Sequence, residues 1–379
     1  MASGALTGAR LRASVILSLA LAVAVYVGLT AYGDFSRLGA ALAGFRWQLV
    51  PAILALTLFN YVVRFIKWEY YLRLIGVRGP STGSGQGSST GQARDVTLSP
   101  SAQLRTGSAK GLPIVRRFFA RSRRAQNDSS PSDLSLADSL NIYWAGLLMV
   151  LTPAKVGEWI KSYFLREATG TPVGRSAPII IAERLTDGLA LVLLALLGLA
   201  SVRQGWAWLL AFLALAAMLI VALRYRPVAR WGLGLLKRWS LLRPYADFLD
   251  QFYASSSALF GWRALAIATA LGVVSWMGEG IATYLVYLGL GVEPGWTAFA
   301  QSVFILALST LVGSLVPLPG GLGAVDFSIA GLSQGLFGLG RGPAAAASVI
   351  VRLCTLWFGV AVGAVSLGLL LRRRRARDP

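Results

Sequence analysis

The chain has 379 residues, of which 55% are hydrophobic and 14% charged, and 36 lysines and arginines outnumber 16 aspartates and glutamates. A soluble fold cannot bury that much apolar surface, so the composition predicts an integral membrane protein, and the net charge of +20 fits membrane topology better than nucleic-acid binding. The absence of histidine excludes imidazole catalysis and histidine metal sites, and the single cysteine excludes an intramolecular disulfide.

Six segments are long and apolar enough to predict full membrane spans. In chain order they cover residues 13–33, 47–75, 176–202, 206–224, 262–291 and 343–371. A cleaved signal peptide is the alternative for the first segment, but its apolar core is longer than such peptides carry. Residues 1–76 therefore form an expected first unit of two spans, and residues 372–379 form a basic cytoplasmic tail.

Residues 77–137 interrupt this pattern and predict a disordered, basic, cytoplasmic insertion. A glycine- and serine-rich linker is followed by the segment GLPIVRRFFARSRRAQ, with five arginines beside apolar residues. Two interpretations stay open for this segment: an interfacial helix on anionic lipid, or a solvated basic stretch. Residues 110–125 are also the expected contact for a cytoplasmic enzyme partner.

The remaining core, residues 138–371, contains two apolar regions that do not fit single spans, 138–167 and 296–340. Proline and clustered glycine in membrane backbone are tolerated only where protein or a water-filled cavity satisfies the freed polar groups. We therefore expect two re-entrant helical hairpins. The expected helix-breaking residues are Pro153, Gly157, Pro319, Gly320, Gly321 and Gly323.

Positive charge then predicts the orientation in the membrane. Six spans and two re-entrant hairpins place both termini on one side, which collects most of the arginines and lysines, Lys155 and Lys161 among them. The opposite side keeps only Arg37, Arg46, Arg203 and Arg341. This pattern predicts a multi-pass protein of the cytoplasmic membrane of the cell, with both termini in the cytoplasm.

The two broken regions resemble each other. Pro153-x-x-x-Gly157 is followed by Arg184, 31 residues after the proline, and Pro319-x-x-x-Gly323 is followed by Arg352, 33 residues after its proline. Three spans separate the hairpins, so the second has to enter from the opposite face. The expected architecture is an all-α polytopic membrane protein with an inverted-topology repeat.

In such a repeat the second arm of each hairpin begins near the midplane. Backbone N–H groups at 154–158 and 320–326 would converge there and hold an anionic headgroup, strengthened by Lys155. In the alternative, Glu158 and Asp326 only complement the helix ends, and the centre suits a cationic or zwitterionic headgroup.

Seven ionisable side chains fall inside the expected membrane core, and left unpaired they would cost about 20 kcal/mol. They are Arg64, Glu183, Arg184, Asp187, Glu279, Asp326 and Arg352. Structural ion pairing is one interpretation, and a headgroup or proton-coupling site is the other. Under the second, the headgroup-binding residues are Lys155, Glu158, Arg184, Glu279, Asp326 and Arg352, and the proton carriers are Glu183, Asp187 or Glu279. Replacing Arg352 by alanine is then expected to abolish transport and leave folding intact.

The phrases LTPAKVGEWIKSYFLRE, AERLTD and LPGGLGAVDFSIAGL resemble the flippase-like family named for the transmembrane region of lysylphosphatidylglycerol synthase, and NYVVRFIKWEYYLRLIG resembles its amino-terminal segment. At matching positions the family pattern covers Pro153, Gly157, Glu158, Glu183, Arg184, Asp187, Pro319, Gly320, Gly321, Gly323, Asp326 and Arg352. Two departures are mild: Ala154 stands where glycine is frequent, and Asp326 where glutamate is frequent.

The resemblance implies a protein that moves a lipid or lipid-linked headgroup between leaflets. In the two-part synthases such a region flips aminoacylated phosphatidylglycerol made by an attached acyltransferase domain. We find no such domain in this sequence and expect no lysyl-lipid synthesis. Some archaeal relatives fuse the region to a glycosyltransferase, which implies polyprenyl-phosphate-linked sugars instead.

We therefore expect a lipid flippase or scramblase that works by alternating access, with no enzymatic activity, metal or cofactor. No Gly-x-x-x-x-Gly-Lys-Ser/Thr motif is found, so transport would be passive or coupled to an ion gradient. The expected partners are membrane lipids with anionic, aminoacylated or polyprenyl-linked headgroups. Small residues such as Gly272, Gly278 and Gly280 permit close helix packing and are compatible with a homodimer.

Two other functions stay open at this stage. One is a partner subunit that transports nothing and recruits a cytoplasmic lipid- or glycan-modifying enzyme through the basic insertion. The other is a membrane glycosyl- or headgroup transferase, against which the lack of an Asp-x-Asp metal signature argues.

Overall fold

The computed structural model of the protein describes residues 8–78, 134–152, 159–199, 258–316 and 318–375, with the single positions 210, 214, 218, 255 and 256. Within these ranges the chain forms helices joined by turns, and it contains no strand. The all-α class predicted from the apolar segments is confirmed.

Three groups of helices follow one another along the chain. The first comprises α1 (Gly8–Gly33), α2 (Phe35–Ala43), the 3-10 turn η1 (Trp47–Leu49) and α3 (Val50–Leu74). The second comprises α6 (Leu136–Leu148), η3 (Met149–Leu151), α7 (Ile160–Thr169) and α8 (Val173–Leu199). The third comprises α12 (Trp262–Gly289), α13 (Trp296–Leu315), η6 (Pro319–Gly321), α14 (Ala324–Phe337), α15 (Arg341–Arg352), the π-helical turn η7 (Leu353–Trp357) and α16 (Phe358–Arg375).

Four helices of the described chain are long and apolar enough to cross a membrane: Trp47–Leu74, Trp262–Gly289, Trp296–Leu315 and Arg341–Ser366. Three of them coincide with the expected spans 47–75, 262–291 and 343–371. Helix α1 covers the expected span 13–33, and α8 covers the expected span 176–202 up to Leu199, whereas the expected span 206–224 lies almost wholly outside the described residues. The protein is therefore a membrane protein with several apolar helices.

The fourth candidate span, α13, differs from the sequence expectation. It is one arm of the expected hairpin 296–340, yet its 20 residues reach about 30 Å at 1.5 Å per residue, the thickness of a bilayer core. Its partner α14 has 14 residues and ends well short of that length. The two arms of this hairpin are thus unequal.

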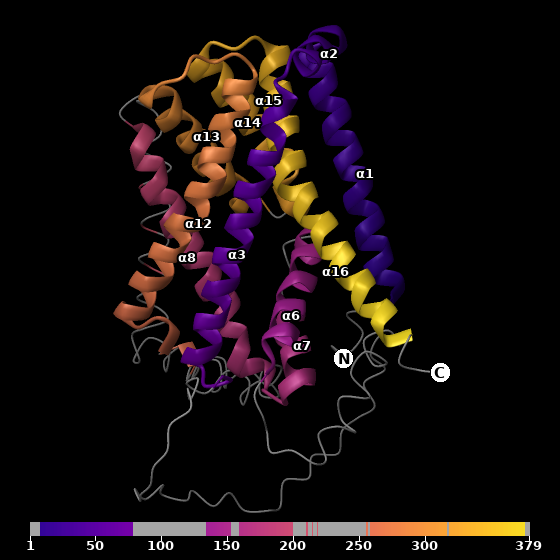
Figure 1. Cartoon of the computed structure of the whole chain (residues 1–379), viewed down its shortest axis with the longest axis vertical. Coiled ribbons are helices and arrows are strands. Elements are labelled where there is room, and N and C mark those ends of the chain that lie inside the picture. Colours follow the sequence, from indigo (N-terminus) through magenta and orange to yellow (C-terminus); the bar gives the residue numbers. More distant parts are fainter. Residues whose placement is uncertain are drawn as a thin grey trace, which may run out of the picture.

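The helices run along one long axis between two ends, which we name the α2 end and the α7 end (upper and lower in Figure 1). At the α2 end, the backbone N–H of Arg46 donates to the carbonyl of Gly289 at 3.2 Å. At the α7 end, Arg175 at the start of α8 donates to the carbonyl of Ile75 at the end of α3, at 2.5 Å. Helices α8 and α12 therefore both run toward the α2 end, antiparallel to α3.

The two broken regions lie as helix pairs that start and finish at one end. Helices α13 and α14 pack against each other with their outer ends at the α2 end, whereas α6 and α7 both reach the α7 end (Figure 1). The inner tips η3 and η6 contact each other. The turn 153–158, which contains Pro153, Lys155, Gly157 and Glu158, lies outside the described residues.

Helix α12 packs against α3, α8 and α13, and small residues on it make the close approach. A Cβ atom at Gly272 would lie 2.9 Å from the Cβ of Ala190 and 3.3 Å from the carbonyl oxygen of Thr186 on α8. A Cβ atom at Gly278 would lie 2.9 Å from Cδ1 of Phe59 on α3. These glycines thus pack helices within one chain.

Candidate functional site

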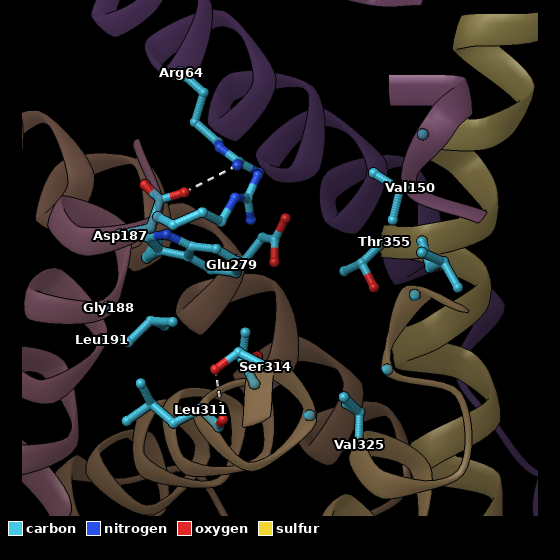
Figure 2. Close-up of a pocket in the computed structure, with 18 of the residues that line it drawn as sticks. Arg64, Val150, Asp187, Gly188, Leu191, Glu279, Leu311, Ser314, Val325 and Thr355 are labelled. Carbon is cyan, nitrogen blue, oxygen red and sulfur yellow. Dashed lines mark hydrogen bonds and ion pairs between the residues drawn. The ribbon is translucent and has the colours of Figure 1, made fainter. Parts of the chain in front are cut away.

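A cavity of about 550 Å³ lies where the tips of the two hairpins meet. Residues from α3, α6, α7, α8, α12, α13, η6, α14, α15 and α16 contribute to its wall. Figure 2 shows Arg64, Asp187 and Glu279 gathered on one side of the cavity and Val150 and Thr355 on another. The volume falls in the range that proteins use to hold a small molecule or a lipid headgroup.

The wall of this cavity is rich in charge for an apolar protein. Among the described residues, four cationic side chains line it, from Arg64, Lys161, Arg184 and Arg352. Two carboxylates line it, from Asp187 and Glu279. The lining therefore carries more positive than negative charge, and this excess favours an anionic ligand.

Helix α8 supplies two carboxylates one turn apart, and each binds a cation from another helix. Asp187 accepts a hydrogen bond from Arg64 at 2.9 Å and also pairs with Lys67, both from α3. Glu183 pairs with Lys161 of α7 at 3.3 Å. Glu183 and Asp187 project from the same face of α8 because they are four residues apart.

Aromatic rings pack against two of these cations. The guanidinium of Arg64 lies 5.5 Å from the ring centre of Trp276 on α12. The ammonium of Lys161 lies 5.0 Å from the ring centre of Tyr143 and 5.4 Å from that of Trp68. Such cation–π contacts gain strength where water is excluded, and they hold both cations in fixed positions.

Arg352, at the end of α15, also lines the cavity and binds the loop that breaks the second hairpin. It donates to the carbonyl oxygen of Gly320 at 2.6 Å, and its Nε lies 3.3 Å from Oδ1 of Asp326. Asp326 in turn accepts the backbone N–H of Gly323 at 2.9 Å through its Oδ2, so its carboxylate caps the first turn of α14. Asp326 is fully buried, and its carboxylate is occupied by these protein contacts.

The backbone of this loop requires glycine. Gly320, Gly321 and Gly323 have φ angles of +58°, +65° and +83°, a region that side chains with a Cβ rarely adopt. A Cβ atom at Gly321 would lie 2.9 Å from Cγ2 of Val325 and 3.3 Å from the carbonyl oxygen of Gly313. The glycines let the chain reverse direction while it stays packed against α13.

Directly after Arg352 the helix widens into the π turn η7, which leaves backbone carbonyls without their usual helical partners. Tyr61 of α3 donates its hydroxyl to the carbonyl of Thr355 in this turn at 2.7 Å. Both side chains line the cavity. The π turn therefore binds Tyr61 of α3 through its backbone, directly after Arg352.

Glu279 differs from the other acidic residues of the site. It is buried on α12, lines the cavity, and within the described part of the chain no cation lies within ion-pair distance of it. A buried carboxylate without a bound cation is costly when ionised. Glu279 is therefore the acidic group best suited to bind a proton or a cationic group.

The structure distributes the predicted site residues unevenly. The predicted site residues that line the cavity are Arg184, Asp187, Glu279, Arg352, Gly320 and Gly321. Glu183 and Asp326 are not among its lining residues and are paired with cations, and Pro319 is buried at the start of η6. Lys155, Glu158, Pro153 and Gly157 fall outside the described residues.

Sequence reasoning missed two cations of this site. The positive-inside pattern places Lys161 with the cytoplasmic charges, but its side chain is 4% exposed and lines the cavity. Lys67 is 1% exposed and pairs with Asp187. The available signal for Lys161 was its place in the second arm of the predicted hairpin, which should enter the membrane. Counting the charges of each loop for the positive-inside rule places Lys161 at the cytoplasmic surface instead.

Comparison with known proteins finds one matching family profile and similar membrane proteins. The profile described as the lysylphosphatidylglycerol synthase TM region matches residues 117–363. A UPF0104 membrane protein of Methanothermobacter thermautotrophicus is similar to this chain, with 35% identity over 102 residues, 27% of this chain and 29% of that protein. A second match, also to a UPF0104 membrane protein of that organism, has 27% identity over 247 residues, 57% of this chain and 70% of that protein.

No solved structure matches the chain. The profile match covers more than half of the chain and includes most of the helices that line the cavity. The chain therefore belongs to the lysylphosphatidylglycerol synthase TM region family.

Proposed function

We propose that the protein moves the polar headgroup of a membrane lipid, or of a lipid-linked compound, across the cytoplasmic membrane through the cavity. The observation that carries this proposal is the described part of the cavity lining, in which four cations and two carboxylates border a space of about 550 Å³. A phosphate-bearing headgroup would bind the excess cations, while the acyl chains stay in the lipid. The family profile, which is that of the transmembrane region of a lipid synthase, supports a lipid as the cargo.

The arrangement of the hairpins supports an inverted-topology repeat in which α6–α8 correspond to α13–α15. In each half two helices enter from one end and return, and the two pairs start from opposite ends (Figure 1). Helix α6 packs on α16, the continuation of α15, and α13 packs on α8, so each hairpin contacts the long helix of the other half. Two halves related by a pseudo-two-fold axis would make such reciprocal contacts. Rocking of one half against the other would expose the cavity to the two sides of the membrane in turn.

The charge pattern supports an orientation with the α7 end in the cytoplasm. Arg166 and Arg175 lie at the α7 end, where α16 also finishes in a run of arginines. The α2 end carries Arg37, Arg46 and Arg341. The positive-inside rule then places both termini on the cytoplasmic side.

Glu279 is the proposed proton carrier if transport is coupled to an ion gradient, because Glu183 and Asp187 already bind cations. The charged groups that act on it are Arg64, Asp187 and Arg352. In proteoliposomes, an imposed proton gradient should accelerate the wild type and leave Glu279→Gln unaffected. An equal response of both proteins rules out this role for Glu279.

A reconstitution experiment tests the proposed transport. The purified protein is placed in liposomes that contain phosphatidylglycerol labelled on an acyl chain, and an impermeant reductant bleaches the outer leaflet. Protein-dependent bleaching beyond the outer-leaflet half is the expected result. Bleaching that matches empty liposomes for anionic, aminoacylated and polyprenyl-linked lipids alike contradicts the proposal.

A matched pair of variants ties the transport to the cavity. Thr310→Trp adds a bulky ring to a residue that lines the cavity. Val365→Trp adds the same ring to an exposed position on α16 that does not line it. The first variant should block bleaching of the inner leaflet, and the second should behave as the wild type.

A second candidate function is recruitment of a cytoplasmic enzyme through residues 110–125, which lie between two chain segments that are fixed to the helices. Arg78 of the segment after α3 pairs with Glu69 and donates to the carbonyl of Leu134 at 3.0 Å, and Ser139 of α6 donates to Glu69. These contacts join the two flanks at the α7 end.

Deletion of residues 80–130, with a short glycine–serine linker in their place, separates the two candidate functions. Loss of function in the cell with normal membrane insertion and normal transport in liposomes supports recruitment. Retained cellular function rules it out.

A further inference from the structure

Two buried aromatic hydrogen-bond donors at the cavity wall have no acceptor within the described chain. They are the hydroxyl of Tyr143 on α6 and the indole N–H of Trp276 on α12. Both residues line the cavity, and their side chains are 1% and 8% exposed. A buried donor without an acceptor is unfavourable, so a ligand that brings an acceptor to this wall would bind there.

Each of these donors belongs to a similar set of three side chains. Lys161 lies over the ring of Tyr143 and is paired with Glu183, and we name these three residues the outer station. Arg64 lies over the ring of Trp276 and is paired with Asp187, and we name these three the inner station. In both stations a carboxylate of α8 holds the cation beside an aromatic donor.

The two stations follow each other along α8. Glu183 and Asp187 are separated by one helical turn, about 5.4 Å along the helix axis. Because α8 runs from the α7 end toward the α2 end, the outer station is the one nearer the α7 end. The stations are therefore consecutive positions on a line that follows the direction of transport.

The cation of the outer station is held in one position by the backbone of α6. The aliphatic stem of Lys161 lies against Gly146, where a Cβ atom would lie 2.9 Å from its Cγ and 3.1 Å from its Cδ. With Glu183 at 3.3 Å and two rings beside it, the ammonium keeps a fixed place on the wall. Such fixed cations beside neutral donors are suited to anionic oxygens.

We propose that the two stations bind the phosphate of a lipid headgroup in succession, so that it passes from one turn of α8 to the next. The inference rests on the proposed transport function and names the binding positions inside the cavity. At each station a phosphate oxygen accepts a hydrogen bond from the aromatic donor and faces the neighbouring cation. No covalent step is involved.

Binding by the purified protein in detergent gives the first test, with short-chain dihexanoyl phosphatidylglycerol as the probe. Loss of one donor to a charged acceptor weakens a station about tenfold, or 1.4 kcal/mol. Because the other station remains, Tyr143→Phe and Trp276→Phe should each weaken overall binding only about twofold, while the double variant weakens it about tenfold. Tyr32→Phe, at a half-exposed tyrosine that does not line the cavity, serves as the control and should bind as the wild type.

We expect the two single variants to differ from the wild type in transport rate but not in stability. Since each station is an obligatory step, either single variant should slow the bleaching of inner-leaflet phosphatidylglycerol about tenfold. The thermal midpoint of Tyr143→Phe should equal or exceed that of the wild type, because the lost hydroxyl has no partner in the described chain. A residue with a merely structural role would not combine slower transport with unchanged stability.

Two results overturn the inference while transport itself stands. If both single variants bind and transport the lipid as well as the wild type does, the two donors do not touch the headgroup. A tenfold loss of binding in each single variant shows one joint site instead of two successive stations. Absence of lipid binding and transport in the wild type would instead remove the proposed function on which the inference rests.

Discussion

Arg352 connects the end of α15 to the loop between α13 and α14. Its guanidinium reaches both the carbonyl oxygen of Gly320 and the carboxylate of Asp326, and it also lines the cavity. A residue in this position stabilises the broken hairpin whether or not it touches the cargo. If the cargo passes through the cavity as proposed, structural and transport roles are combined in this one side chain.

This geometry changes the expected outcome of replacing Arg352. Arg352→Ala leaves the buried Asp326 carboxylate without its cation, and breaking a buried pair costs about 3 to 5 kcal/mol. We therefore expect the variant to lose stability as well as transport, measured as a lower thermal midpoint in detergent. Asp326→Asn with Arg352→Gln, which removes both charges, should recover part of that stability.

A thermal midpoint of Arg352→Ala equal to that of the wild type would contradict this prediction. The sequence expectation of intact folding would then hold, and Arg352 would act through the cargo alone. The double variant keeps the test informative because it separates the loss of the pair from the loss of the side chain.

At the scale of single elements, η6 is the clearest case in which the sequence determines a shape. Both of its glycines, Gly320 and Gly321, have positive φ angles, as does Gly323 just after it, and Pro319 is buried at the start of the turn. The proline and glycine cluster was sufficient to predict a break between two helices. It could not show that Arg352, 32 residues away along the chain from Gly320, would hold the break closed.

Alanine substitution distinguishes the turn glycines from the other glycines of the same hairpin. Gly321→Ala forces a Cβ atom into a positive φ angle and against Val325, so we expect a loss of about 2 kcal/mol in stability. Gly335→Ala on α14 is the matched control, since no atom lies within 4 Å of its Cβ position. The control should be neutral or slightly stabilising, because alanine favours helix.

Chemical unfolding monitored by circular dichroism measures the difference between these two variants. Equal stability of Gly321→Ala and Gly335→Ala would show that the backbone at η6 relaxes freely. Such a result would remove the argument that glycine is required there.

For the whole molecule, the orientation proposed from the charge pattern can be tested directly. Ser36 is exposed at the α2 end, and Arg166 is exposed at the α7 end. In a Cys354→Ala background, Ser36→Cys should react with an impermeant maleimide in intact cells. Arg166→Cys should react only after the membrane is permeabilised.

The native cysteine provides the control for this labelling. Cys354 is buried, so the unmodified protein should remain unlabelled in both conditions. Labelling of Arg166→Cys in intact cells would reverse the orientation, and labelling of both sites would mean that the two ends share one side.

The amino-acid sequence by itself determined the class of the protein, most of its helices and its family pattern. Runs of apolar residues can be satisfied only by helices in lipid, and glycine and proline clusters mark where those helices stop. The buried charges were also evident in advance, since an ionisable residue inside an apolar run has to pair or face a cavity.

Only the tertiary structure decided which charges meet. Arg64 and Lys67 both reach Asp187 across more than a hundred residues, Lys161 reaches Glu183, and Glu279 keeps no cation within the described chain. Pairing depends on the crossing of α3, α8 and α12, which glycines at the contacts allow and which no local pattern encodes. The cavity and its excess of positive charge exist because these distant helices pack together, and for that reason the site could not be derived from the sequence alone.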